Sequence, residues 1–142
     1  MDFSAINWLA VLVCVVAAMV IGSLWYNPKT FFPTWWKAID KPGEPGMNGG
    51  KGMAATWGLT ILAALVQAIF MSLFVTAMGS MNAAGPSLVS GMTAGFLLWL
   101  GFVAPSSLTN KLFSGQMKAW FIEVGAHLVT FVVMGAILGA WR

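Results

Sequence analysis

Long apolar runs separated by short polar segments dominate the chain. Four of these runs are long enough to cross a lipid bilayer as helices, and they lie at about residues 6–26, 53–78, 87–103 and 118–141. A helical span needs about 20 residues, because a helix rises about 1.5 Å per residue through about 30 Å of hydrocarbon. The pattern therefore predicts four membrane-spanning helices, with little of the chain left for anything but connections.

The first run has a competing interpretation as a cleaved signal peptide. Its start carries the acidic residue Asp2 and no basic residue, and no clear small-residue cleavage site follows the run. A signal peptide has a basic start and a cleavage site of small residues. We therefore expect residues 6–26 to be retained as the first helix.

The connection over residues 27–52 divides into two parts. Its first half is aromatic, and Pro33 stands at a position suited to the first turn of a helix. We expect a short interfacial helix there, with its rings at the depth of the lipid headgroups. Residues 42–52 are rich in glycine and proline and are predicted to be a flexible loop.

The other two connections differ from each other. Residues 79–86, with the sequence GSMNAAGP, carry no charge and predict a tight turn between the second and third spans. Residues 104–117 contain serine, threonine, asparagine and lysine and are predicted to be a polar loop.

Composition supports a protein dissolved in lipid. Hydrophobic residues make up 59% of the 142 residues and charged residues only 8%, with a mean hydropathy of +0.84. A soluble domain has about 25% charged residues, so this composition excludes a soluble enzyme or a disordered chain. The lone Cys14 excludes an internal disulfide. The expected fold is an all-α integral membrane protein: a single domain over 1–142, built as a four-helix transmembrane antiparallel bundle with a short interfacial helix after the first span.

The few charges predict the orientation. The formal net charge is +3, and the lysines gather in the first and third connections, while the second has none. Cytoplasmic connections hold the excess of lysine and arginine. We therefore expect the protein to lie in the inner (plasma) membrane of a bacterium. Loops 27–52 and 104–117 should then be cytoplasmic, and both termini should lie outside. Lysines that flank apolar runs are topology signals, so no nucleic-acid partner is expected.

Small residues recur at a spacing of four within the spans. In a bilayer, helices associate through close packing of such residues, since lipid tails are as apolar as leucine. The faces either build the bundle of one chain or, on one helix, meet another subunit. The helix-packing candidates are Ala10, Cys14, Ala18, Gly22, Gly91, Gly95, Gly135 and Gly139.

Aromatic residues mark the ends of the predicted helices. Tryptophan and tyrosine prefer the membrane–water interface, where an apolar ring with a polar tip is most stable. The predicted interfacial anchors are Trp8, Trp25, Tyr26, Trp35, Trp36, Trp120 and Trp141.

Of the polar side chains within the spans, four stand out as candidates for a site, namely Asn7, Gln67, Glu123 and His127. Glu123 and His127 are four residues apart and therefore share one helix face. A charge at the bilayer centre costs about 2.5–3.5 kcal/mol, part of which a hydrogen bond between the two would offset.

Three interpretations of this pair remain open. It could be a hydrogen-bonded contact that fixes the fourth span against Gln67, Thr60 or Ser72 of the second span. It could be a proton- or cation-handling site. His127 could also bind haem or a chlorin, with Glu123 orienting its ring. A lone histidine is a weak metal signal, so no metal site and no cofactor is predicted.

No nucleophile–base motif, phosphate-binding loop, CxxC or HExxH appears in the sequence. We therefore expect a protein that is not an enzyme. The preferred hypothesis is that it acts by helix–helix association, as a homo-oligomer or as an accessory subunit of a larger membrane complex. Its expected partners are the lipid bilayer and other membrane subunits or itself. The alternatives are a small-solute or proton-coupled transporter using Glu123 and His127, and a pigment-binding subunit.

Four stretches resemble a known family. They are INWLAVLV at 6–13, GSLWYNPKTFFPTWWKA at 22–38, LLWLGFV at 97–103 and HLVTFVVMGAILGAW at 127–141. Together they are similar to the bacterial membrane-protein family catalogued as domain of unknown function 1761. The resemblance implies a small integral membrane protein of four helices, and it implies no reaction, substrate or catalytic residue. The Gly/Pro-rich stretch at 42–52 departs from the charged linker expected there.

Overall fold

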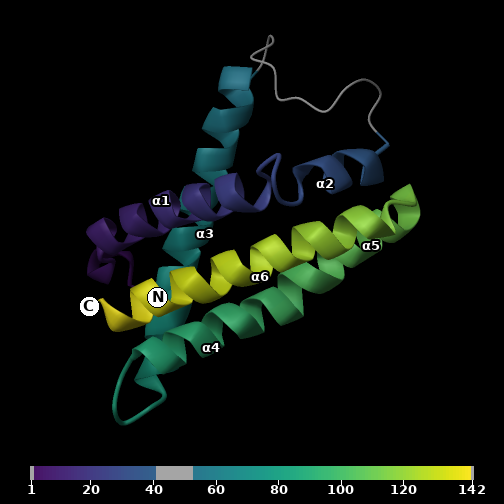
Figure 1. The fold of residues 1–142 in the computed structure, drawn as a ribbon. Coiled ribbons are helices and arrows are strands. Elements are labelled where there is room, and N and C mark those ends of the chain that lie inside the picture. The colour runs from purple at the N-terminus through teal and green to yellow at the C-terminus, as the bar shows by residue number, and fades with distance from the viewer. Residues whose placement is uncertain (1, 41–52, 142) are drawn as a thin grey trace.

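The computed structural model describes residues 2–40 and 53–141, which form helices joined by turns (Figure 1). The Gly/Pro-rich segment predicted to be a flexible loop over 42–52 lies outside the described residues. In chain order the elements are η1 (Phe3–Ala5), α1 (Trp8–Trp25), α2 (Phe32–Ala38), α3 (Met53–Ser80), α4 (Leu88–Leu98), η2 (Trp99–Val103), α5 (Ala104–Ser114) and α6 (Met117–Ala140).

Four helices in the described residues are long and apolar enough to cross a membrane. They are Trp8–Trp25, Met53–Ser80, Leu88–Ser114 and Met117–Ala140. The expected all-α membrane fold with four spans is thereby confirmed. The short helix predicted to start near Pro33 is also present as α2, with proline in its first turn.

The third span is longer than its sequence pattern indicates. Residues 104–117, predicted to be a polar loop, are helical as far as Ser114, and α4, η2 and α5 run on as one helix of 27 residues. The η2 segment is a π-helical turn in which the Ala104 N–H donates to the Trp99 carbonyl. Proline has no N–H and collides with the carbonyl four residues earlier, here that of Gly101. Because Gly101 lies in this wider π turn, the helix passes Pro105 without ending.

Helices α4 and α6 pack backbone against backbone. A Cβ added at Gly91 would collide with the Gly135 carbonyl, and one added at Gly95 would collide with the Phe131 carbonyl. Gly139 meets Ser87 and Gly91 in the same way. Only glycine permits the two backbones to approach so closely. Such close packing stabilises the association of helices in lipid.

The small face of α1 fills the centre of the bundle. Ala10, Cys14 and Ala18 are buried, and the Cys14 thiol donates to the Met134 carbonyl of α6 at 3.7 Å. Across from them lie Ala64 and Ala68 of α3, which belong to the same buried cluster.

The two ends of the bundle differ in charge. Asn7 Nδ2 donates to the Trp141 carbonyl at 3.5 Å, so the start of α1 and the end of α6 lie side by side (Figure 1). The opposite end, where α2 meets the α5–α6 turn, carries Lys29, Lys37, Lys111 and Lys118, and we call it the basic end. There Gln116 Nε2 donates to the Ile39 carbonyl at 3.0 Å and Gln116 Oε1 accepts from Lys111 Nζ at 3.2 Å.

Helix α3 crosses the other helices obliquely, and its first half stands away from them (Figure 1). Residues 54–63 are exposed, whereas buried residues recur from Ala64 onward. The described residues therefore leave a wedge of space between the first half of α3 and the helices α1 and α6.

Candidate functional site

The wedge beside α3 holds the candidate site, which we call the cleft. It has a volume of about 650 Å³, within the range typical of small-molecule sites. Its walls come from α1, α2, α3 and α6 and are mostly apolar. The polar side chains at its surface include Tyr26, Thr60, Gln67, Glu123, His127 and Thr130.

Three of the four polar residues singled out within the spans meet at this cleft. Gln67 approaches from α3, and Glu123 and His127 approach from α6. Each is only partly exposed. Residues 67 and 123–127 are distant in sequence, so their convergence is a property of the fold.

Asn7 lies elsewhere and has a structural role. Its Oδ1 accepts from the Ala10 N–H at 3.1 Å, which makes it the N-cap of α1. Ser72, a suggested partner of Glu123 and His127, is also outside the cleft and accepts at its carbonyl from the Thr76 hydroxyl.

Glu123 has a hydrogen-bond donor and an ion-pair partner at the basic end. Its Oε1 accepts from Trp35 Nε1 of α2 at 2.8 Å and lies 3.2 Å from Lys111 Nζ of α5. Both charged side chains are mostly shielded, at 16% and 18% exposed for Lys111 and Glu123. The ion pair offsets the cost of a carboxylate in an apolar span.

The expected hydrogen bond between Glu123 and His127 is not among those of the described residues. Helical side chains lean toward the N-terminus of their helix, and this carries the Glu123 carboxylate toward Lys111 and the basic end. His127 lies one turn deeper on the same wall of the cleft. The two residues therefore share the cleft without pairing.

Tyr26 contributes a phenol to the rim of the cleft, just beyond the end of α1. Burial raises the pKa of this phenol, and the nearby charge of Glu123 adds to the increase. The Tyr26 phenol therefore keeps its proton to a higher pH than an ordinary tyrosine does. Its ring packs edge-on against Trp35, with centroids 5.3 Å apart, so that Tyr26 and Trp35 form one aromatic wall.

Several predicted anchors make bonds within the protein. Trp25 Nε1 donates to the Ile122 carbonyl at 2.9 Å, and Trp120 Nε1 donates to Ser107 Oγ at 3.0 Å. Trp36 packs against Phe32, with ring centroids 5.6 Å apart. Trp8 and Trp141 are exposed beside the two termini.

The predicted packing residues are placed mainly between helices of this one chain. Ala10, Cys14 and Ala18 are buried in the core, and the four glycines of α4 and α6 face one another. Gly22 differs, because it lines the cleft and nothing lies within 4 Å of a Cβ added there.

Sequence reasoning missed two partners of Glu123. Lys111 was interpreted only as a topology signal and Trp35 only as an anchor, although both contact Oε1. No spacing in the sequence relates residues 35, 111 and 123. One general signal was available. A carboxylate within a membrane span needs a partner, and a lysine side chain can supply the opposite charge.

Among the described residues, no group of three or more His, Cys, Asp or Glu side chains is placed to hold a metal ion. The chemistry available in the cleft is therefore ionic and hydrogen-bonding: a paired carboxylate, an imidazole, an amide, hydroxyls and aromatic faces.

The fold and the cleft define a small multi-pass membrane protein with a polar site enclosed by apolar helices. The family model described as protein of unknown function (DUF1761) matches residues 9–139, and the chain belongs to this family. No curated protein and no solved structure matches the chain.

Proposed function

We propose that this membrane protein is not an enzyme and that it binds a small solute in the cleft, as the binding step of transport. The observation that supports the proposal is the convergence of Gln67, Glu123 and His127 on one cavity. Ionisable groups inside a bundle are costly, and they are typical of sites that handle substrates, ions or protons.

Glu123 and His127 are the groups suited to coupling. The ion pair with Lys111 gives the carboxylate an internal counter-charge when the cleft is empty. A solute or proton that reaches Glu123 competes with that lysine. Binding in the cleft would thereby loosen the contact between α5 and α6, which provides a route from occupancy to helix movement.

The association hypothesis has less support from the arrangement of the helices. The small faces that suggested it are used within the chain, since Gly91 meets Gly135 and Cys14 meets Met134. Homo-oligomer formation or an accessory role remains the competing proposal. The orientation with both termini outside and the basic end in the cytoplasm is a separate part of the proposal.

Native mass spectrometry of the protein, gently released from its membrane, tests the proposal. We expect small-molecule adducts on the wild-type chain that His127→Phe and Gln67→Leu lose. The matched control is Thr93→Val, since the exposed Thr93 lies outside the cleft and its hydroxyl donates to the Val89 carbonyl within its own helix. A stably attached protein subunit with no small-molecule adduct would contradict the proposal and favour association.

A further inference from the structure

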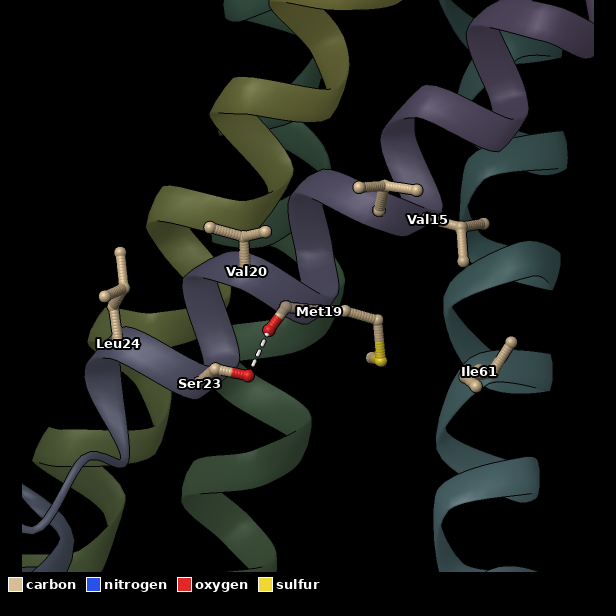
Figure 2. Close-up of a pocket in the computed structure, with 7 residues that line it drawn as sticks. Val15, Met19, Val20, Ser23, Leu24 and Ile61 are labelled. Carbon is tan, nitrogen blue, oxygen red and sulfur yellow. Dashed lines mark hydrogen bonds between the residues drawn. The ribbon is translucent and has the colours of Figure 1, made fainter.

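A second hollow lies beside the cleft, and we call it the groove. It is a shallow depression of about 430 Å³ between α1 and the first half of α3. Figure 2 shows its walls, with Val15, Val20 and Leu24 on α1 and Ile61 on α3. Val20, Leu24 and Ile61 are each about half exposed or more, so the groove faces the lipid.

The groove offers almost no polar surface. Its single hydroxyl, that of Ser23, donates to the Met19 carbonyl at 2.8 Å, as the dashed line in Figure 2 marks. The other walls are aliphatic or thioether groups. Such a surface suits a hydrocarbon chain and has little to offer a polar group.

The groove and the cleft are neighbours. Met19 and Ser23 line both of them, so the groove adjoins the cleft along α1. A molecule that occupied both would need an apolar tail and a polar head joined end to end. Met19 is a flexible side chain that can shift to admit such a chain.

The chemistry of the cleft selects the head. Trp35 and Lys111 both contact Glu123 Oε1, and among the described residues that line the cleft Glu123 is the one carboxylate and no lysine or arginine is present. The aromatic rings of Tyr26, Trp35 and Trp57 also line the cleft, and ring faces attract cations. A carboxylate beside aromatic rings favours an ammonium head and disfavours a phosphate or sulfonate.

We propose that the cleft and the groove together bind a single-chain amphiphile with an ammonium head, which enters sideways from the bilayer between α1 and α3. The head lies against Glu123 in the cleft, and the alkyl tail lies in the groove beside Ile61. This inference rests on the proposed function and names its ligand class.

The test measures binding of dodecylammonium and butylammonium to the protein in lipid nanodiscs, at concentrations that leave the discs intact. The groove is filled by Ile61→Trp, with Leu62→Trp as the matched control, since Leu62 is exposed on α3 but does not line the groove. Partitioning into lipid is the same for every variant, so it cancels in the comparison. Val20→Trp fills the groove from the opposite wall and guards against misfolding of one variant.

We expect Ile61→Trp and Val20→Trp to weaken dodecylammonium binding about tenfold or more, a loss of about 1.4 kcal/mol. Leu62→Trp should bind as the wild type does, and butylammonium binding should be unchanged in all three variants. Dodecyl sulfonate should not compete. Equal dodecylammonium binding by Ile61→Trp and Leu62→Trp, with binding still lost in Glu123→Gln, would overturn the tail site and leave the cleft intact. Amine binding that is independent of Glu123, or absent at both chain lengths, would overturn the head site as well.

Discussion

Lys111 Nζ lies 3.2 Å from Glu123 Oε1 and joins the end of α5 to the start of α6. The pair is the charged part of a chain of contacts that continues through Trp35 to α2 and through Gln116 to Ile39. Because Lys111 supplies the opposite charge, the Glu123 carboxylate in this membrane span is not an isolated charge. Glu123 therefore both links the helices of the basic end and lines the cleft.

Lys111→Met should destabilise the fold more than removal of both charges. The single change leaves Glu123 shielded and without its counter-charge, whereas Lys111→Met with Glu123→Gln leaves no charge to compensate. We expect a coupling energy of about 1–3 kcal/mol in a double-mutant cycle, measured by thermal unfolding in a mild detergent.

Lys118→Met is the matched control, because Lys118 is an exposed lysine at the same end of the bundle. It should leave the midpoint of unfolding unchanged. If Lys111→Met behaved like Lys118→Met, the ion pair would have no structural role.

Gly91→Ala should disrupt the packing of α4 against α6. The added methyl group would collide with the Gly135 backbone carbonyl, which cannot rotate away as a side chain could. We expect a loss of about 1–3 kcal/mol or more in the free energy of unfolding. Gly58→Ala is the control, since nothing lies within 4 Å of a Cβ there and alanine is the better helix former. Unfolding midpoints of the two purified variants compare them, and equal midpoints would count against direct backbone contact.

Much of the fold could be predicted from the sequence, because the length of the apolar runs follows directly from the thickness of a bilayer. The length of the third span could not. Pro105 and the polar residues after it look like a loop, and only the π turn over Trp99–Val103 lets the helix continue.

The candidate site was predicted in part. The spacing of Glu123 and His127 places them on one helix face, and the scarcity of polar residues within spans marks Gln67. The partners of Glu123 depend on how α2 and α5 pack against α6, and no local pattern records that packing. Asn7 looked like a site residue because a helix N-cap and a buried polar group are alike in sequence.

Trp25→Phe should loosen the junction of α1 and α6. Phenylalanine keeps an aromatic ring but loses the N–H that donates to the Ile122 carbonyl, and it is too short to fill the space above Gly125, where a Cβ would lie 2.9 Å from Trp25 Cζ2. We expect a cost of about 1–2 kcal/mol in thermal unfolding. Trp8→Phe, at an exposed tryptophan of the same helix, should cost little; equal effects would show that Trp25 acts only as an interfacial anchor.

The orientation can be tested by labelling single cysteines in a Cys14→Ala background. If the lysine-bearing end is cytoplasmic, Asn82→Cys in the uncharged turn should react with a membrane-impermeant maleimide added outside intact cells. Ser114→Cys at the basic end should react only after the membrane is opened. The reverse labelling pattern would invert the topology.

The central claim is that Gln67 and His127 face one cleft inside the bundle, where polar side chains converge between apolar walls, whereas their neighbours on the same helices face lipid. The most direct measurement is the reaction of Gln67→Cys and His127→Cys, without Cys14, with a small water-soluble thiosulfonate in lipid discs. The matched controls are Val66→Cys and Val129→Cys, whose positions are exposed on the outside of α3 and α6. We expect the two cleft positions to react at least about tenfold faster, because a thiol surrounded by hydrocarbon rarely forms the reactive thiolate. Equal rates at positions 66 and 67, or at 127 and 129, would contradict the account.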